Sequence, residues 1–184
     1  MKVNKTDIEE VLIISPDMFG DERGYFIESF NTKRYKEFGI PAFVQEGESK
    51  SVQGVLRGLH YQLSPYAQGK LVRVVSGKVL DVAVDIRLGS KTYGKYTSHV
   101  LSGENKQQLW IPAGFAHGFL TLSSEAIFSY ACMQYYNKES ERSIVWNDKD
   151  LNIKWGIKNP ILSAKDTVGV AMTFKEAEKE IKNS

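Results

Sequence analysis

The sequence of 184 residues is poor in cysteine, in long apolar runs and in excess charge of either sign. Cys132 is the only cysteine, which excludes an intrachain disulfide and suits a small core side chain in a reducing compartment. No apolar stretch approaches the ~20 residues that a membrane-spanning helix needs. The N-terminal run VLII is also too short for a secretory signal. We therefore expect a cytoplasmic protein with no membrane partner.

The charge balance and the missing motifs exclude several classes of function. Lys and Arg total 24 and Asp and Glu 22, so the net charge of +2 provides no field that would attract a nucleic-acid polymer. The three histidines, His60, His99 and His117, show no HxH or HxxxH spacing, which disfavours a metal site. The sequence also has no GxSxG, GxGxxG or GxxxxGK[ST] motif. The chemistry that remains is acid–base catalysis without a metal or cofactor.

Turn signals recur at short spacing and separate runs rich in Val, Ile, Leu, Tyr and Phe, a pattern typical of a β-sandwich or barrel. The clearest pair of strands is KLVRVV (70–75) and VLDVAVDIR (79–87), joined by the turn residues SGK. In the second strand, the two-residue period separates an apolar face from a mixed face that carries Asp81 and Asp85. One face of this strand is therefore expected in the core.

Two segments depart from the strand pattern. NTKRYKEFG (31–39) is too polar for a buried strand and ends in Gly39, which suits a helix C-cap. MTFKEAEKEIKN (172–183) places Phe174 and Ala177 at helical spacing. We predict two short helices at the margins of a single all-β domain that spans residues 1–184.

The stretch GVLRGLHYQ (54–62) places Arg57 and His60 in an otherwise apolar strand. Residues three apart in a regular strand point to opposite faces, but a bulge or kink at Gly58 would turn both inward. His60 is the best candidate for a general base, because the ordinary pKa of histidine lies near neutrality. A purely structural histidine, and a surface Arg57 paired with a carboxylate, remain the alternatives.

The other candidate groups are unremarkable when each is taken alone. His117 lies among the glycines and proline of WIPAGFAHGFLTL, and Asp166 is a loop carboxylate. Lys70 begins an apolar strand, where solvated lysines are common. Tyr130 and Tyr136 lie in FSYACMQYYNKESE, where one phenol is suited to donate a proton and another to stack on a nucleobase. The alternative to a functional role is that these tyrosines are structural residues of the core and its rim.

Taken together, six stretches resemble the dTDP-4-dehydrorhamnose 3,5-epimerases of nucleotide-sugar metabolism, and they cover nearly the whole chain. The stretches are FGDERGYFIESFN (19–31), SKSVQGVLRGLHYQ (49–62), QGKLVRVVSGKVLDVAVDIR (68–87), ENKQQLWIPAGFAHGFLTL (104–122), SIVWND (143–148) and LSAKD (162–166). The resemblance implies a cupin-like jelly-roll β-sandwich. It also implies a homodimer to which about residues 1–50 contribute, and a reaction without metal or cofactor.

The reaction that the resemblance implies inverts C3 and C5 of dTDP-4-dehydro-6-deoxy-D-glucose and yields dTDP-4-dehydro-L-rhamnose. In the catalytic set that it implies, His60 is the base and Asp166 its carboxylate partner. Tyr130 is the acid on the opposite face of the sugar, and Lys70 lies near the C4 oxygen. Both carbons are alpha to the C4 ketone, so acid–base groups suffice for this chemistry.

The resemblance also implies a set of substrate-binding residues. Arg57 would bind the diphosphate with its forked guanidinium, and Tyr136 would stack on thymine. Asp81 and His117 would form a polar pair beside the sugar. The remaining contacts that it implies are Arg23, Glu28, Gln45, Glu46, Gly47, Glu141 and Lys165, of which the first two would reach across from a partner subunit.

The segment QEGES (45–49) departs from the QDNHS of many family members. Gly47 replaces an asparagine and Glu48 a frequent histidine, so one contact on the nucleotide side is lost or made by backbone alone. Three alternatives to the 3,5-epimerase stay open. They are an epimerase acting at one centre, such as C3, a sugar-nucleotide 3,4-ketoisomerase on a similar barrel, and a non-catalytic sugar-binding cupin.

Overall fold

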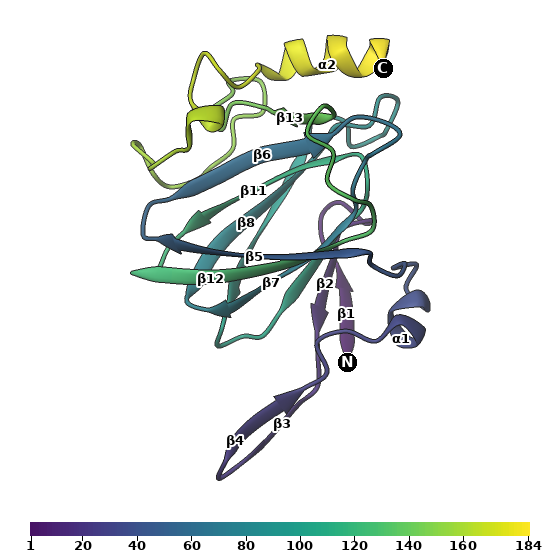
Figure 1. Cartoon of the computed structure of the whole chain (residues 1–184), viewed down its shortest axis with the longest axis vertical. Coiled ribbons are helices and arrows are strands. Elements are labelled where there is room, and N and C mark those ends of the chain that lie inside the picture. The colour runs from purple at the N-terminus through teal and green to yellow at the C-terminus, as the bar shows by residue number, and fades with distance from the viewer.

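The computed structural model describes residues 1–184 and contains two β-sheets packed face to face, with a two-stranded hairpin projecting from one end (Figure 1). The strands of the six-stranded sheet are, in spatial order, β1 (Lys2–Lys5), β2 (Leu12–Ser15), β10 (Gln108–Ile111), β7 (Lys70–Ser76), β12 (Glu125–Cys132) and β5 (Gln45–Val52). Those of the five-stranded sheet are β13 (Glu141–Ser143), β6 (Leu56–Gln62), β11 (Phe115–Thr121), β8 (Lys78–Asp85) and β9 (Tyr96–Ser102). The projecting hairpin consists of β3 (Met18–Asp21) and β4 (Gly24–Ile27). Every strand pair within these sheets is antiparallel, and the all-β sandwich that the sequence predicts is confirmed.

Alternating side chains from both sheets fill the space between them. This inner core includes Val72, Val79, Leu109, Phe119 and Phe128, all at most 5% exposed. The outer face of the five-stranded sheet is also buried, because the C-terminal segment lays Leu151, Trp155 and Phe174 against it. The outer face of the six-stranded sheet is covered in part by Tyr35 and Ile40.

The paired strands 70–75 and 79–87 form as β7 and β8, but they are not hydrogen-bonded to each other. β7 pairs with β10 and β12, whereas β8 pairs with β9 and β11, so the SGK turn passes from one sheet to the other. At this crossing Gly77 has φ +82°, and a Cβ there would lie 2.1 Å from a backbone oxygen. Both faces of β8 are buried, and the mixed face turns Asp81 toward the space between the sheets, where it is fully buried.

Both predicted helices are confirmed. α1 (Thr32–Lys36) ends where Gly39 takes φ +76° and the N–H of Ile40 is donated to the carbonyl of Tyr35, a left-handed closure that favours glycine. α2 (Phe174–Asn183) begins at a capping box between Thr173 and Glu176. A 3-10 turn, η1 (Ala164–Asp166), precedes α2. No helix is long and apolar enough to cross a membrane.

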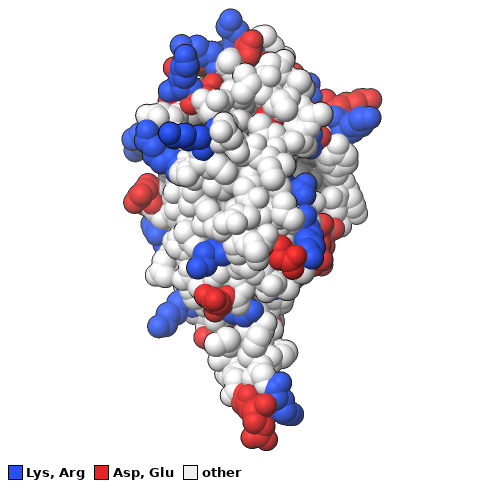
Figure 2. All heavy atoms as spheres, turned by 90° about the vertical axis from the view of Figure 1, so that its left-hand side faces the viewer, with Lys and Arg blue, Asp and Glu red and all other residues white.

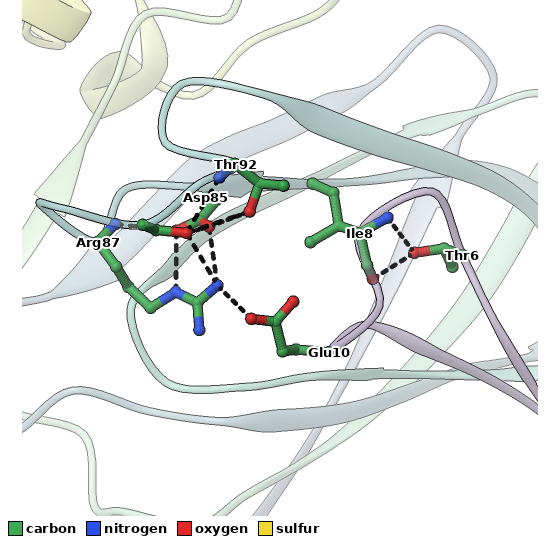
Figure 3. A network of polar contacts seen from close by, with 7 residues as sticks. Thr6, Ile8, Glu10, Asp85, Arg87 and Thr92 are labelled. Carbon is green, nitrogen blue, oxygen red and sulfur yellow. Dashed lines mark hydrogen bonds and ion pairs between the residues drawn. The ribbon is translucent and has the colours of Figure 1, made fainter.

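A polar network centred on the buried Asp85 anchors the end of β8 to the N-terminal segment (Figure 3). The Asp85 carboxylate accepts hydrogen bonds from Arg87 at 2.8 and 2.9 Å and from Thr92 at 2.6 Å. Arg87 also donates to Glu10 at 3.1 Å, and its guanidinium lies 4.6 Å from the ring centroid of Phe115. The loop between β8 and β9 is thereby fixed to the β1–β2 connection.

Candidate active site

A cavity of about 270 Å³ opens between the two sheets, on the side where β5 and β6 lie. Its walls come from β5, β6, β7, β11 and β12, together with the loops before β7 and β13 and the turn η1. The lining residues are Gln45, Ser49, Arg57, His60, Gln68, Lys70, His117, Phe119, Phe128, Tyr130, Cys132, Tyr136, Ser163, Lys165 and Asp166. Most of the polar side chains that the sequence singles out therefore converge on one place.

A bulge in β6 brings Arg57 and His60 to the same side. In the pairing of β6 with β11, His60 is opposite His117 and Arg57 is opposite Phe119, so three steps on one strand match two on the other. The extra residue lies at Gly58, which has φ +120° and passes so close to β11 that a Cβ would lie 2.6 Å from backbone atoms of its neighbour. The predicted irregularity at Gly58 is confirmed.

His60 and Asp166 form a hydrogen-bonded pair in the cavity wall. The Nε2 of His60 lies 2.6 Å from Oδ1 of Asp166, although 106 positions separate the two in the chain. A carboxylate only accepts, so Nε2 carries the proton and Nδ1 is left as the basic nitrogen. Burial lowers the pKa of His60, against the opposing influence of Asp166, so the ring is neutral at pH 7 and able to take up a proton.

Two serines hold the Asp166 carboxylate in place. Ser163 donates to Oδ2 at 2.7 Å, and Ser143 of β13 donates to Oδ1 at 3.3 Å. Burial acts to raise the pKa of Asp166, but the hydrogen bond and charge of His60 and the hydrogen bond from Ser163 outweigh it and lower the pKa overall. The carboxylate thus stays ionised while it is almost completely shielded from solvent.

Lys70 and Tyr130 project into the cavity from the six-stranded sheet. Lys70 begins β7, and burial lowers the pKa of its ammonium. Tyr130 lies on β12, two residues before Cys132, which is the direct neighbour of Lys70 across the strands. His60 belongs to the other sheet, so the imidazole and the phenol approach the cavity from opposite walls.

A second histidine–carboxylate pair joins His117, which lines the same cavity, to Asp81. The Nε2 of His117 is 2.9 Å from Oδ2 and 3.1 Å from Oδ1 of Asp81, and both residues are buried. The ring of His117 also stacks on Phe128, with the ring centroids 6.0 Å apart. This pair fixes the imidazole beside an apolar wall that Phe119 and Phe128 form together.

A polar chain at the cavity rim connects three separate segments. Glu141 of β13 accepts a hydrogen bond from Tyr136 at 3.1 Å and pairs with Lys165 at 2.6 Å. Burial acts to raise the pKa of Glu141, but Lys165 outweighs it and the pKa is lowered. Gln45 accepts a hydrogen bond from the backbone N–H of Tyr136 at 2.9 Å, which ties the loop after β12 to the start of β5.

The arrangement suits the removal of a proton from a carbon next to a carbonyl group. His60 is a neutral base on one wall, Tyr130 is a proton donor on the other, and Lys70 offers a positive charge for a developing oxyanion. No three His, Cys, Asp or Glu side chains gather in an arrangement that could hold a metal ion.

Comparison with known proteins identifies the family. A family profile described as dTDP-4-dehydrorhamnose 3,5-epimerase matches residues 5–174. The dTDP-4-dehydrorhamnose 3,5-epimerase of Shigella flexneri is 60% identical over 171 residues, covering 92% of this chain and 94% of that protein. The chain belongs to the dTDP-4-dehydrorhamnose 3,5-epimerase family.

Solved structures of related epimerases share the fold. The crystal structure of the dTDP-6-deoxy-D-glucose-3,5-epimerase of Legionella pneumophila, in complex with dTDP-4-keto-L-rhamnose, matches with a TM-score of 0.93 and 52% identity, covering 98% of this chain and 96% of that chain. A 3′-monoepimerase of Streptomyces bikiniensis, in complex with dTDP-quinovose, matches with a TM-score of 0.88 and 32% identity, covering 96% of this chain and 89% of that chain. Enzymes that differ in the number of centres they invert are thus both similar to this epimerase-family chain.

Three of the residues predicted to contact substrate neither line the cavity of this epimerase-family chain nor bond to a side chain that lines it. Arg23 lies at the tip of the β3–β4 hairpin and pairs with Asp21, and Glu28 lies just beyond the hairpin and pairs with Arg34 at 2.7 Å. Glu46 is on the outward face of β5, because side chains alternate along that strand. Within one chain Glu46 does not line the cavity, and its contact with substrate stays a prediction.

The other predicted residues come together in or directly beside the cavity. Asp81 and Glu141 do not line it but bond to His117 and to Lys165, which do. Gly47 lies opposite Tyr130 in the pairing of β5 with β12. Sequence reasoning missed several lining residues and one supporting residue, among them Ser49, Gln68, Ser143 and Ser163. Ser163 lies three residues before the predicted Asp166 in the quoted stretch LSAKD, and that short spacing is a signal that could have found it. Ser143, in SIVWND, is 23 residues from Asp166, and the sequence offers no such signal for it.

Proposed function

We propose that this chain inverts C3 and C5 of dTDP-4-dehydro-6-deoxy-D-glucose to give dTDP-4-dehydro-L-rhamnose. The observation that carries the proposal is the placement of the His60–Asp166 pair and Tyr130 on opposite walls of one cavity, with Lys70 between the same sheets. Membership of the epimerase family supports the same reaction.

Each inversion proceeds through an enolate. Nδ1 of His60 removes the proton from C3 or C5, and the electron pair of that C–H bond moves into the ring to place negative charge on the C4 oxygen. The Lys70 ammonium stabilises this oxyanion, at the position where charge develops. Tyr130 then donates its phenolic proton to the opposite face of the carbon. The phenolate regains a proton from solvent, and the imidazolium of His60 returns its proton to solvent. No electrons leave the substrate, so the reaction needs no redox cofactor, and the Lys70 ammonium fills the role that a Lewis-acidic metal ion has in other enolate-forming reactions.

The nucleotide lies along the cavity mouth in this proposal. Arg57, held by Ser51 at 3.0 Å, binds the diphosphate with the part of its guanidinium that stays free. Tyr136 stacks on thymine and is oriented by Gln45 and Glu141. Lys165 adds positive charge at the rim, and the buried Asp81–His117 pair contacts the sugar.

The active form that we propose is a cytoplasmic homodimer to which about residues 1–50 contribute. The β3–β4 hairpin extends away from the sandwich (Figure 1), and its side chains Met18, Phe19, Tyr25 and Phe26 are between 56% and 66% exposed. A hairpin with so much exposed apolar surface needs a partner surface to cover it. A second copy of the chain would provide that surface, and would place Arg23 and Glu28 near the partner's cavity.

Two variants test the catalytic assignment. His60→Ala should abolish conversion of dTDP-4-dehydro-6-deoxy-D-glucose, because the proposed base is lost, while dTDP binding remains. Tyr130→Phe should reduce conversion by about 10² to 10⁴, the range that a positioned acid contributes, and should spare proton removal. Product formation is followed by NMR and dTDP binding by calorimetry. Wild-type turnover by His60→Ala would contradict the proposal.

A second candidate is an epimerase that inverts a single centre. The similarity to the 3′-monoepimerase of Streptomyces bikiniensis supports this candidate. The higher identity to 3,5-epimerases favours inversion at both centres. Identification of the product by NMR separates the two, since inversion at C3 alone leaves the C5 methyl group in its original configuration.

A further inference from the structure

The side chain of Gln62, at the end of β6, joins the two loops 63–69 and 133–140, each of which carries a residue of the cavity wall. Its Nε2 donates to the carbonyl of Tyr66 at 2.6 Å and to that of Tyr135 at 3.2 Å, and its Oε1 accepts the backbone N–H of Asn137 at 2.8 Å. Gln62 is 7% exposed and does not line the cavity. Since both amide protons and the amide oxygen are engaged by backbone, Gln62 is placed to act on the loops and not on a substrate.

The bonds of Gln62 flank Tyr136, the residue that stacks on thymine in the proposed function. Gln62 binds the backbone carbonyl before Tyr136 and the backbone N–H after it, and Gln45 accepts the N–H of Tyr136 itself at 2.9 Å. Glu141, the direct neighbour of Gln62 in the pairing of β13 with β6, accepts the phenolic O–H at 3.1 Å. Tyr136 is 51% exposed, so hydrogen bonds rather than packing hold its ring in place.

The catalytic part of β6 does not depend on the side chain of Gln62. His60, two residues earlier, is paired through the strand backbone with Ser143 on β13 and with His117 on β11. Its imidazole is held by Asp166 at 2.6 Å. None of these contacts involves the amide at position 62. A substitution there should therefore loosen the two loops and leave the base in place.

We propose that Gln62 is a positioning residue for the nucleotide: it fixes the backbone on both sides of Tyr136 and so presents the ring to the thymine base before the substrate binds. This inference rests on the proposed function, in which Tyr136 stacks on thymine. A ring that is already in place spares the entropy of ordering a loop on binding. In this assignment β6 directs Arg57 to the diphosphate, His60 to the sugar and Gln62 to the support of the base.

The effect should appear in nucleotide binding rather than in turnover. Removing an aromatic ring on which a base stacks weakens binding by about 5- to 150-fold, and that sets the upper limit for a residue that acts only through the ring. Gln62→Met keeps an unbranched side chain of similar size but removes the amide, and it leaves two carbonyls and one N–H without their partner. We expect the Kd for dTDP and the KM to rise by about 5- to 20-fold and kcat to change by less than about threefold.

The test measures the Kd for dTDP by calorimetry, and kcat and KM with dTDP-4-dehydro-6-deoxy-D-glucose. Gln53→Met is the matched control, because the amide of Gln53 also donates to a backbone carbonyl, that of Leu122 at 3.0 Å, but lies outside the cavity. It should match wild type in all three quantities. Gln62→Glu is a second variant that keeps an acceptor for Asn137 and loses both donated bonds, so it should raise Kd and KM as well. Circular dichroism shows whether each variant is folded at the assay temperature.

A double variant shows whether Gln62 acts through Tyr136. Tyr136→Ala alone should weaken dTDP binding, and Gln62→Met should add no more than about twofold in that background. The inference is overturned if the folded Gln62 variants bind dTDP as wild type does, lose kcat rather than KM, or add their full effect to Tyr136→Ala, and also if neither variant folds.

Failure of the proposed function gives different results. Wild-type binding of dTDP by Tyr136→Ala would overturn the stacking on thymine, and this inference with it. Absence of conversion by the wild-type protein would overturn the proposed reaction, whatever the Gln62 variants do to the binding of dTDP.

Discussion

Replacing Asp85 with asparagine should weaken the fold in a manner that depends on pH. The carboxylate is fully buried, and its bonds to Arg87, Ser90 and Thr92 are shown in part in Figure 3. Burial acts to raise its pKa, but these hydrogen bonds outweigh burial and lower the pKa from 3.8 to about 2. At about 1.4 kcal/mol per pH unit, the charged form contributes about 2 kcal/mol to the free energy of unfolding at pH 7.

The direction of the pH dependence follows from the lowered pKa. A carboxyl whose pKa is lower in the folded chain stabilises fully above its unfolded value of 3.8, and loses that effect as pH falls toward 2. Asparagine at position 85 has no proton to gain. The difference in stability between wild type and Asp85→Asn should therefore shrink by about 1 kcal/mol between pH 7 and pH 3.

Urea unfolding at one fixed protein concentration measures both quantities. Glu10→Gln is the matched control, because it removes only the exposed partner of Arg87 and should cost no more than about 1 kcal/mol. Equal stability of wild type and Asp85→Asn at pH 7 would refute the reasoning. So would a difference that stays constant from pH 7 to pH 3.

Two further predictions concern activity and assembly. Burial lowers the pKa of both His60 and Lys70, so kcat/KM should follow a bell-shaped pH profile with its acid midpoint below 6.5 and its alkaline midpoint below 10.5. An acid midpoint above 6.5 would contradict the lowering of the pKa of His60 by burial. Replacing both Phe19 and Phe26 with serine should convert the proposed homodimer to monomer in analytical ultracentrifugation, and a dimer that both wild type and variant form would exclude the hairpin from the interface.

The features that the sequence predicts well depend on local rules. Alternating apolar residues and frequent turns predict the sandwich, and Gly39 and the spacing of Phe174 and Ala177 predict the two helices. The bulge in β6 is predictable because Gly58 lies between two polar side chains that both need the same side of the strand. Each of these signals is contained within about ten residues of sequence.

Which strands pair with each other is harder to predict from the sequence, because the alternation of apolar and polar residues along a strand does not show to which sheet the strand belongs. The SGK turn links consecutive strands that belong to different sheets, and Gly77 permits that passage by its close approach to another backbone. The face on which Glu46 lies was also not anticipated. Glu46 belongs to a stretch rich in predicted contacts, yet the alternation of side chains along β5 turns it outward.

Among the site residues, too, the sequence predicts some relations and leaves others to the fold. The sequence resemblance names His60 and Asp166 as partners, and the fold brings them to 2.6 Å. The hydrogen bond that Ser143 donates to Asp166 joins residues 23 positions apart in the chain, and the contact of His60 with Asp166 joins residues 106 positions apart. No spacing rule within one segment can express such relations.

The charge distribution fits a site for a small molecule rather than a polymer. The face shown in Figure 2 carries scattered Lys, Arg, Asp and Glu around a broad uncharged area, with no continuous basic stripe. The positive groups proposed to meet the substrate, Arg57, Lys70 and Lys165, are instead gathered at one cavity. Positive side chains that gather at one cavity are sufficient to bind a diphosphate, although the net charge of the whole chain is only +2.

The most direct test of the account is to incubate the protein with dTDP-4-dehydro-6-deoxy-D-glucose in deuterium oxide and to locate deuterium on the sugar ring by NMR. The account predicts deuterium at both C3 and C5 with the wild-type protein and at neither carbon with His60→Ala. Deuterium at one carbon alone would establish the single-centre reaction in its place. No deuterium at all, while an established 3,5-epimerase labels both carbons under the same conditions, would contradict the account.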